Sequence, residues 1–423
     1  MTIEPDDREL LEEPDAVNGQ GASVWERSAA GLRNYWYPVC GSRDVKTRWP
    51  SRFTRLGYEI AIVRRNGKPY AFLDECPHRG YTLSDGKYEF PGSDSITCRL
   101  HGMTFDLADR GNCVAVLTDG PDSPAVGKFR LRTFPTEERK GVVWVWFGRG
   151  APAPLEEDVP GLVLQDDTLV KFRFRTVEGN WRNHATQDAG HFPTLHRDAI
   201  GLLFSQIQGY AVAREPDYVR DPYDGAVWLV QRNSSHQPIM QAEYPGLGVW
   251  PPKRLWRKMP RGGGTVPLKG VDARGGAFRL PGILRVINFP FKAGMLYEWY
   301  VAEDPDHYTY FQLTCHFPRN PLSWLYTQAW YYLWGRPMRK IRFNNQDRKP
   351  VAAQWRYWKR YGANPPSRLY RPDEFNLAII DHVNRNARGE GSDWQTAEAE
   401  RRAAFALEEL PSIAGGSGDE PQA

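Results

Sequence analysis

Two short stretches, CPHRG at residues 76–80 and CRLHG at residues 98–102, decide how the chain is read. Each places one cysteine near one histidine, with Cys-x-His spacing in the first and Cys-x-x-His spacing in the second. Structural zinc sites of the Cys2His2 type usually group like ligands, so zinc is the weaker interpretation of these mixed pairs. A [2Fe–2S] cluster with two thiolates on one iron and two imidazoles on the other fits them better. The predicted ligands are Cys76, His78, Cys98 and His101.

Mixed ligands of this kind indicate an electron-transfer role for the first site. Exchanging two thiolates for two neutral imidazoles removes two negative charges. The reduction potential then rises to roughly −150 to +300 mV, from about −400 mV for an all-cysteine cluster of the plant type. Such a cluster accepts electrons readily and passes them on to another centre.

A second candidate metal site lies in residues 180–196, NWRNHATQDAGHFPTLH. Asp188 and His191 are three residues apart and share one face of a helix. A straight helix would point His191 and His196 in different directions, but Pro193 should end or kink the helix and let the second histidine turn back. Two neutral histidines and one carboxylate form the facial triad of non-heme Fe(II) oxygenases. By themselves, two histidines in a helical stretch are equally compatible with packing or surface positions.

The two cluster motifs resemble the cluster-binding loops of Rieske non-heme iron oxygenases. The entry segment NYWYPV at residues 34–39 is also similar to the start of these proteins. The sequence departs from the family in two places. Residues 79–97 between the half-sites form a slightly longer insert than usual, with the extra length expected in the turn at 91–94. Met103 stands where a tryptophan commonly follows His-Gly.

The resemblance also implies ligands for a mononuclear Fe(II). The family pattern Asp-x2-His-x4-His matches Asp188, His191 and His196 in turn. Asp347, in the segment Asn-Gln-Asp, resembles the carboxylate ligand of many members. In the family, the aspartate matching Asp188 links the iron site to a cluster histidine of the adjacent subunit, which would be His78 or His101 here.

The assignment of Asp347 has alternatives. Aspartate is a favoured N-cap residue, and a helix is expected to begin at the next position, Arg348. The two roles do not exclude each other. The rival carboxylates for iron are Asp373, Glu374 and Asp381.

The fold class implied by the resemblance is α+β. An N-terminal antiparallel β Rieske domain would precede a C-terminal α+β catalytic domain, in which helices cover a curved antiparallel sheet. We expect a polar N-terminal segment at 1–32, the Rieske domain at 33–150, the catalytic domain at 151–395, and a C-terminal helix and tail at 396–423.

Local patterns predict the main elements. Asn66-Gly67 between two apolar runs is typical of a tight β-hairpin, and VVWVWF at 142–147 is typical of a buried strand. Longer strands are predicted at 168–177, 226–232, 281–290, 294–302 and 308–316. Helices are predicted near 181–191, 322–336, 348–360, 374–384 and 394–409.

Composition excludes several classes of protein. The 423 residues carry a net charge of only +4, which gives no reason to expect a nucleic-acid partner. No apolar run approaches the roughly 18 residues of a membrane span, so no membrane partner is expected. The five cysteines show no disulfide framework, which favours a cytoplasmic location. The aromatic run at 324–334 is expected to form a core helix or a subunit contact rather than a substrate site.

Functionally, the resemblance implies a terminal oxygenase. Electrons from NAD(P)H would pass through a separate reductase, and perhaps a ferredoxin, to the cluster and then to Fe(II), where O2 is used to hydroxylate or demethylate a small organic, ring-containing substrate. The chain has no Gly-rich dinucleotide fingerprint, so another protein must take the hydride. Family members are commonly homotrimers. The alternatives are an electron carrier without oxygenase activity and a metal-stabilised binding protein.

Overall fold

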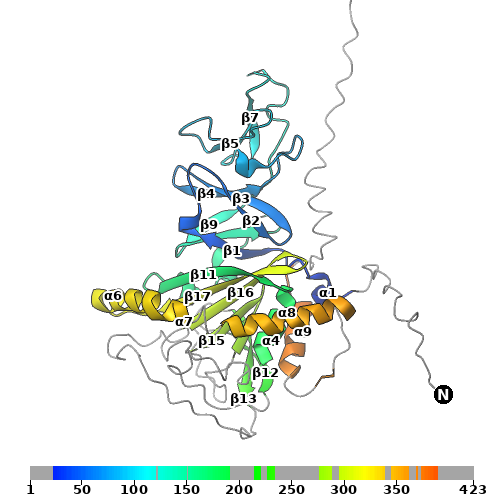
Figure 1. Cartoon of the computed structure of the whole chain (residues 1–423), viewed down its shortest axis with the longest axis vertical. Coiled ribbons are helices and arrows are strands. Elements are labelled where there is room, and N and C mark those ends of the chain that lie inside the picture. Colours follow the sequence, from blue (N-terminus) through cyan, green and yellow to red (C-terminus); the bar gives the residue numbers. More distant parts are fainter. Residues whose placement is uncertain are drawn as a thin grey trace, which may run out of the picture.

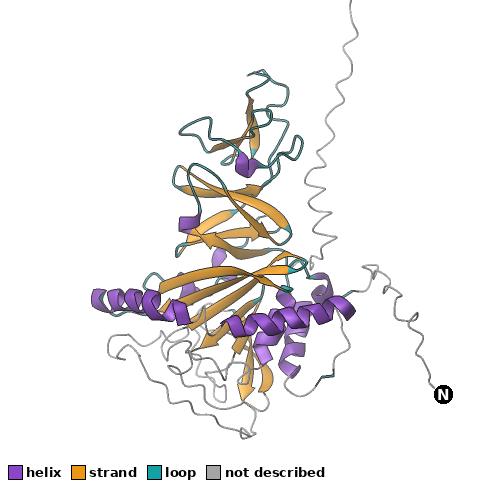
Figure 2. Cartoon of the chain, viewed as in Figure 1, coloured by secondary structure: helices purple, strands orange, loops and turns teal. Residues whose placement is uncertain are grey.

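The computed structural model shows a stack of antiparallel sheets, with helices packed on one face of the largest sheet (Figure 1). Figure 2 separates the strands and helices by colour. The structure describes residues 22–120, 122–149, 151–190, 214–220, 226–233, 276–287, 295–338, 344–361, 368–369 and 373–388.

Three small sheets form the N-terminal half of the described chain, which we call the N-terminal sheets. The hairpin predicted around Asn66-Gly67 is confirmed, because both residues have positive φ, at 44° and 83°, as a tight turn between β3 and β4 requires. The strand orders are β1-β10-β9, β2-β3-β4-β8 and β5-β6-β7. The strands are β1 (Tyr35–Gly41), β2 (Ser51–Arg55), β3 (Tyr58–Arg65), β4 (Lys68–Leu73), β5 (Ser95–Thr97), β6 (Met103–Asp106), β7 (Asn112–Val116), β8 (Thr133–Phe134), β9 (Thr136–Arg139) and β10 (Val142–Phe147).

A seven-stranded antiparallel sheet follows, in the order β11-β17-β16-β15-β14-β13-β12. Both faces of β16 are buried over its first eight residues, so this sheet is covered on both sides. Trp299 of β16 packs edge-on against Trp144 of β10, with ring centroids 5.6 Å apart. One hydrophobic core therefore continues from the N-terminal sheets into the large sheet. The strands are β11 (Leu169–Glu178), β12 (Arg214–Arg220), β13 (Val227–Asn233), β14 (Gly276–Arg279), β15 (Ile283–Ile287), β16 (Met295–Asp304) and β17 (His307–His316).

Helices cover the other face of this sheet. Helix α4 contacts β14, β15 and β16, helix α8 contacts β11 and α4, and helix α9 contacts β12, β13 and α4. The helical elements are α1 (Val24–Arg27), η1 (Ser42–Asp44), η2 (Leu83–Asp85), α2 (Leu155–Asp158), α3 (Gly161–Leu164), α4 (Trp181–Gly190), α6 (Pro321–Trp330), η5 (Tyr331–Gly335), α7 (Arg336–Met338), α8 (Asn344–Tyr361) and α9 (Glu374–Asn386).

The expected start of α8 was wrong. The helix begins at Asn344 rather than Arg348, so Asp347 lies in its first turn and is not its N-cap. The N-cap preference of aspartate is a local tendency, and the surrounding packing overrides it. Pro350 lies inside the helix, where it removes one i→i−4 hydrogen bond near the start.

The end of the N-terminal segment packs against α4. Ser23 caps α1, and Trp25 lies edge-on against Trp181 at 5.6 Å. The indole N–H of Trp181 donates to the carbonyl of Ser28 at 2.6 Å, and the Arg182 guanidinium donates to the carbonyl of Trp25 at 3.0 Å. These hydrogen bonds tie the first turn of α4 to the residues of α1 and to Ser28, which follows it.

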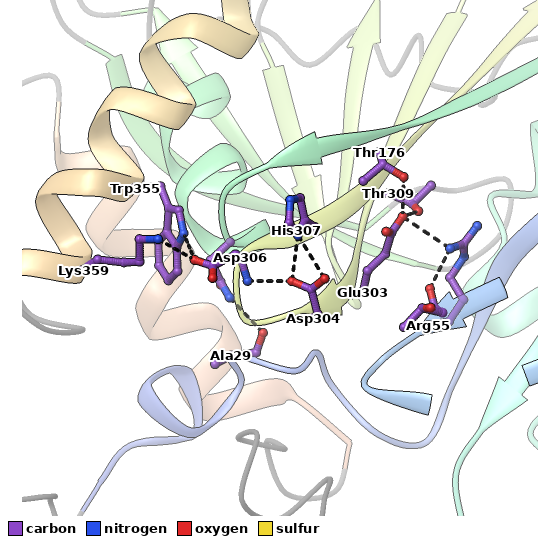
Figure 3. A network of polar contacts seen from close by, with 12 residues as sticks. Ala29, Arg55, Thr176, Glu303, Asp304, Asp306, His307, Thr309, Trp355 and Lys359 are labelled. Atoms are coloured by element: carbon purple, nitrogen blue, oxygen red, sulfur yellow. Dashed lines mark hydrogen bonds and ion pairs between the residues drawn. The ribbon is translucent and has the colours of Figure 1, made fainter. Parts of the chain in front are cut away.

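The turn between β16 and β17 joins the N-terminal sheets to α8 (Figure 3). Glu303 pairs with Arg55 of β2 at 3.4 Å, and the backbone N–H of Leu56 donates to the carbonyl of Ala302 at 2.6 Å. On the other side of the same turn, Asp306 accepts from the indole N–H of Trp355 at 2.8 Å. Lys359 adds an ion pair to the same aspartate at 2.9 Å.

Candidate metal centres

The four predicted cluster ligands come from two loops with the same backbone geometry. In each loop, the N–H of a glycine donates to the carbonyl of the cysteine: Gly80 to Cys76 at 2.8 Å and Gly102 to Cys98 at 3.0 Å. Both glycines have positive φ, at 69° and 71°, a conformation that glycine adopts without strain. At Gly102 the space is also tight, because a Cβ there would lie 2.6 Å from the Cβ of Leu117. The two segments, 76–80 and 98–102, therefore share a backbone conformation as well as a similar sequence.

The two loops bring the four side chains together at the far end of the N-terminal sheets. The rings of His78 and His101 lie 4.7 Å apart between centroids. Cys76 and Cys98 are buried, whereas His78 is exposed and His101 is half-buried. This arrangement, with sulfur inside and imidazole at the surface, fits a cluster whose histidine-bound iron faces the outside.

The electrostatic environment of the loops favours a thiolate at Cys98, with the thiol of Cys76 as its hydrogen-bond donor. The Cys76 thiol hydrogen-bonds to Cys98, which lowers the pKa of Cys98 to about 6 and raises the pKa of Cys76. Burial raises the pKa of both thiols, and backbone N–H groups oppose it. The donors are the N–H groups of His78 and Arg79 at Cys76, and of Leu100 and His101 at Cys98. Since thiolate is the metal-binding form, these amides would stabilise the sulfurs of a bound cluster.

The environment of His78 favours the neutral form of its imidazole. Burial lowers the pKa of His78, and the neighbouring His101 and Arg79 act in the same direction. Neutral imidazole is the form that binds a metal. The donor set and its charges therefore fit the [2Fe–2S] cluster predicted from sequence.

The long insert between the half-sites is held against a neighbouring hairpin. The amide of Asn66, in the β3–β4 turn, donates to the carbonyl of Gly92 and to Asp94, at 3.0 Å each. Met103, which replaces the usual tryptophan, is buried in the small core beneath the cluster loops. Both departures from the family pattern are accommodated without displacing a ligand loop.

Helix α4 carries the beginning of the second predicted site. Asp188 falls within α4. His191 and His196 lie outside the described residues, so their predicted roles stay predictions. Among the described residues, no three His, Cys, Asp or Glu side chains converge on a single ion; the cluster loops instead present two pairs, Cys76 with Cys98 and His78 with His101.

Asp347 is buried near the start of α8, at 3% exposure. It shares one face of that helix with Val351 and Gln354, at i, i+4 and i+7. Gln354 accepts a long hydrogen bond from the amide of Asn183 in α4, at 3.5 Å, and Val351 lies against Gly179 just before α4. The face of α8 that carries Asp347 is thus turned toward α4.

The rival carboxylates are placed differently. Asp381 is half-exposed and paired with Arg385 at 2.7 Å on the outside of α9. Asp373 precedes α9 and accepts from Asn376 at 3.4 Å. Neither has the burial of Asp347.

His184 of α4 is buried against the large sheet. Its Nδ1 hydrogen-bonds to the hydroxyl of Tyr308, and its ring lies 4.6 Å from that of Tyr300 and 5.1 Å from that of Tyr310. The tyrosines lead to Glu298, a buried carboxylate that accepts from Tyr300, Tyr310 and Gln312. Sequence reasoning missed this polar network; a glutamate inside the buried run MLYEWYVA was the available signal.

Comparison with known proteins agrees with this architecture. Residues 35–135 match the family model of the Rieske [2Fe-2S] domain, and residues 146–389 match that of the homotrimeric ring hydroxylases. Two similar proteins are terminal oxygenase components of carbazole 1,9a-dioxygenase. The protein from Sphingomonas sp is 34% identical over 302 residues, covering 68% of this chain and 75% of the relative. The protein from Metapseudomonas resinovorans is 31% identical, covering 69% of this chain and 74% of the relative.

Solved structures give the same result. The carbazole 1,9a-dioxygenase terminal oxygenase from Novosphingobium sp. KA1 aligns with a TM-score of 0.73 at 26% identity, covering 87% of this chain and 96% of that one. A reduced complex between oxygenase and ferredoxin in carbazole 1,9a-dioxygenase aligns with a TM-score of 0.72 at 25% identity, covering 92% and 96%. In the part of the chain that the structure describes, no helix is long and apolar enough to cross a membrane.

Proposed function

The chain belongs to the Rieske non-heme iron oxygenases of the homotrimeric ring-hydroxylase family, and we propose that it dihydroxylates a planar, fused-ring aromatic or heteroaromatic compound. The observation that carries this proposal is the union of a cluster-binding pair of loops with a ring-hydroxylase domain similar to that of carbazole 1,9a-dioxygenases. An electron carrier without oxygenase activity is not favoured, because such a protein has no use for residues 146–389.

The proposed reaction balances with two electrons. An aromatic carbon–carbon bond, O2, two electrons and two protons give a cis-dihydrodiol. The electrons come from NAD(P)H through a reductase and a ferredoxin, and they enter at the cluster. A bound Rieske cluster supplies one-electron transfer at a potential raised by its two imidazoles. The chain's own contribution is to hold His78 and His101 at the surface, where a partner can approach, and to keep the two cysteines buried.

We propose His191, His196 and Asp347 as the ligands of the mononuclear Fe(II). Bound there, the metal would supply the site at which O2 is used, with positions left open by a three-residue ligand set. The observation that fits is a buried carboxylate on the face of α8 turned toward α4, the helix that leads directly into residue 191. Helix α4 is itself held by α8, α9 and the large sheet, and its first turn bonds to the carbonyls of Ser28 and Trp25.

Asp188 is proposed to connect the two metal sites. It stands three residues before the proposed ligand His191 in the sequence, the spacing of about one helical turn. A carboxylate near a metal-bound histidine can accept from the free ring N–H and fix the tautomer of that ligand. In a trimer, the same carboxylate would reach toward His78 or His101 of the next copy.

The enzyme is proposed to act in the cytoplasm. The five cysteines are free and buried in the structure, and the expected electron source is a soluble NAD(P)H-dependent reductase. A reducing compartment keeps cysteines available for cluster assembly.

The test is product formation from 18O2. Purified enzyme, a Rieske-oxygenase reductase and ferredoxin, and NADH would be incubated with carbazole, fluorene and a single-ring control. We expect a fused-ring product carrying both atoms of one O2. Incorporation of a single oxygen atom would contradict dihydroxylation, and turnover of the single-ring compound alone would contradict the fused-ring substrate.

A further inference from the structure

Three buried tyrosines of the large sheet meet on the face that carries the helices. Tyr300 of β16 and Tyr310 of β17 are cross-strand partners, and their rings stack 5.6 Å apart at an angle of 4°. The ring of Tyr308 lies 6.3 Å from that of Tyr300. The ring of His184 in α4 lies 4.6 to 5.5 Å from those of all three. We call the three tyrosines the tyrosine group.

Each phenol of the tyrosine group has a proton acceptor within hydrogen-bond reach. Tyr310 and Tyr300 both donate to the carboxylate of Glu298. The hydroxyl of Tyr308 bonds to Nδ1 of His184, which accepts when the ring proton is on Nε2. A phenol that loses an electron also releases its proton, so these acceptors suit the tyrosines to one-electron oxidation.

Packing alone does not require the hydroxyl groups. Phenylalanine would fill the same space, and replacing both partners of a buried hydrogen bond by apolar groups of the same shape is often neutral for stability. The sheet instead buries the carboxylate of Glu298, which is 4% exposed. Burying a charge is unfavourable unless hydrogen bonds satisfy it. The tyrosine group and its carboxylate therefore point to a chemical role.

Helix α4 leads from the tyrosine group to the proposed iron site. A helix rises about 1.5 Å per residue, so residue 190, at the end of α4, lies about 9 Å along the axis from His184. The proposed iron ligand His191 is the next residue. The helix that supplies the proton acceptor of Tyr308 thus also leads to a proposed iron ligand.

Helix α8 connects the tyrosine group to the surface. Its residues Asp347, Val351 and Trp355 share one face, at i, i+4 and i+8. A Cβ at Gly179 would lie 3.6 Å from Cε1 of Tyr308 and 3.8 Å from Cβ of Trp355, so both side chains lie against this glycine. Trp355 is half-buried, and the proposed ligand Asp347 lies two turns before it.

Trp355 has a proton acceptor of its own. Its indole N–H donates to the carboxylate of Asp306 at 2.8 Å (Figure 3). The side chain of Asp306 is 45% exposed, so this end of the path reaches solvent. The same arrangement of an oxidisable ring beside a base therefore recurs from the interior to the surface.

We propose that the tyrosine group and Trp355 form an electron relay that protects the iron site when O2 is reduced without substrate. The inference rests on the proposed dihydroxylation and iron ligands. In that reaction NAD(P)H gives two of the four electrons that O2 accepts, and the aromatic carbon–carbon bond gives the other two. Without substrate those two electrons are missing, and the oxidant at the iron site would attack nearby side chains.

The first steps take place inside the tyrosine group. Tyr310 gives one electron to the oxidant and its hydroxyl proton to Glu298, which leaves a neutral phenoxyl radical. An electron then passes from Tyr308 to Tyr310 through the ring contacts of Tyr300. Tyr310 takes its proton back from Glu298, and Tyr308 releases its own proton to Nδ1 of His184. The radical has then moved toward α8, away from the iron site.

The last steps restore the tyrosines from the surface. Trp355 gives an electron to Tyr308, which takes its proton back from His184, and the indole proton passes to Asp306. A thiol or another small reductant in the solvent then reduces Trp355 and returns its proton. A second round supplies the second missing electron, and protons from solvent complete the reduction of O2 to water.

The first experiment follows radicals during turnover without substrate. Full-length, metal-loaded enzyme with ferredoxin, reductase, NADH and O2 would be frozen during turnover and studied by EPR. We expect a neutral tyrosyl radical, whose hyperfine structure narrows when the protein contains ring-deuterated tyrosine. Tyr300→Phe with Tyr310→Phe should lose most of this signal and be inactivated in fewer substrate-free turnovers. Glu298→Gln should also lose most of the signal, because an amide does not take up the phenol proton.

A matched control removes two buried phenols elsewhere. Tyr297, on the opposite face of β16, packs on Trp228 and Trp299 with ring centroids 6.2 and 6.3 Å away. Tyr37 donates to the carbonyl of Leu32 in the N-terminal sheets. Tyr297→Phe with Tyr37→Phe should keep the radical signal. An unchanged cluster spectrum would show that each variant is folded, and the phenylalanine pairs decide the case even where Glu298→Gln does not fold.

A second experiment does not need the mononuclear iron. The native cysteines are buried, so a ruthenium photo-oxidant can be attached to a cysteine introduced by Lys359→Cys, one helical turn after Trp355. Tyr357→Phe would remove an exposed phenol near the label. Flash oxidation should draw an electron from Trp355 and then produce a tyrosyl radical. Tyr308→Phe should remove most of that radical.

The outcomes separate the relay from the proposed iron site. Equal EPR signals in the Tyr300–Tyr310 variant and its control would overturn the relay, as would substrate-free O2 consumption by the wild type without a tyrosyl radical. An unchanged photochemical yield in Tyr308→Phe would also overturn it. A protein that forms the photochemical radical through Tyr308 but consumes no O2 would uphold the relay path and count against the proposed iron ligands.

Discussion

His382 gives stability a dependence on pH that follows from its surroundings. The side chain is 3% exposed in α9, between the rings of Tyr218 and Phe278, and its Nδ1 lies 3.1 Å from the amide nitrogen of Asn386. Burial lowers the pKa of His382 to about 4, against a smaller opposing effect of Asp381. The folded protein therefore keeps this imidazole neutral where the unfolded chain, with an ordinary pKa of 6.5, takes up a proton.

The sign and size of the effect follow from linkage. As pH falls from 7 toward 4, the imidazole of His382 binds a proton in the unfolded state but stays neutral in the folded state. The free energy of unfolding therefore falls. Between pH 7 and pH 5 the loss is about 2 kcal/mol, and it levels off once pH drops below the folded pKa. Above pH 7 both states are neutral at this position and the dependence vanishes.

His382→Gln isolates this contribution, because glutamine retains a polar side chain and does not titrate. We expect the variant to lose less stability than the wild type between pH 7 and pH 5, by about 2 kcal/mol. Urea unfolding followed by tryptophan fluorescence at both pH values would measure this. Loss of metal at pH 5 affects both proteins alike, so the difference between them reports on residue 382. Parallel losses in the two proteins would refute the reasoning.

Three further predictions concern the metal centres. Cys98→Ser should abolish the visible cluster spectrum and acid-labile sulfide, and a sulfide-free wild-type protein that binds zinc would refute the cluster. Asp347→Ala should remove mononuclear iron and turnover while the cluster spectrum is retained; full iron content in that variant would move the search to Asp373, Glu374 and Asp381. Asp188→Asn should leave the cluster reducible but lower product in single-turnover assays of pre-reduced enzyme at least about tenfold. Wild-type yield and rate there would show that Asp188 is not the link.

The two loops that carry the predicted cluster ligands could be recognised from the sequence because their information is local. Cys76 and His78 share one loop, and Cys98 and His101 share another, so spacing alone places each pair. Gly80 and Gly102 mark the positive-φ positions that close the loops. The geometry of each loop therefore does not depend on packing between residues far apart in the sequence.

The structure of the second half of the molecule was harder to predict from the sequence. Asp347 was singled out by its likeness to a family segment, whereas its burial depends on the contact of α8 with α4, where Asn183 bonds to Gln354 across 171 positions of the chain. The start of α8 was misplaced because a capping preference worth about 1 kcal/mol competes with tertiary packing. The contact of His184 with Tyr308 joins residues 124 positions apart and has no local signature.

The turn between β16 and β17 has a consequence for recombination between relatives. On one side of the turn, the carbonyl of Ala302 accepts from the N–H of Leu56 and Glu303 pairs with Arg55. On the other side, Asp306 accepts from Trp355 and pairs with Lys359; the contacts of Glu303 and Asp306 are drawn in Figure 3. A chimera that takes its cluster domain from one oxygenase and its catalytic domain from another cuts through this junction. Of the two ion pairs, Arg55–Glu303 is the buried one, and removing one partner of such a pair leaves the other charge uncompensated, at a cost of roughly 3–5 kcal/mol. Successful grafts will therefore carry the β2–β3 turn and residues 302–306 from the same parent.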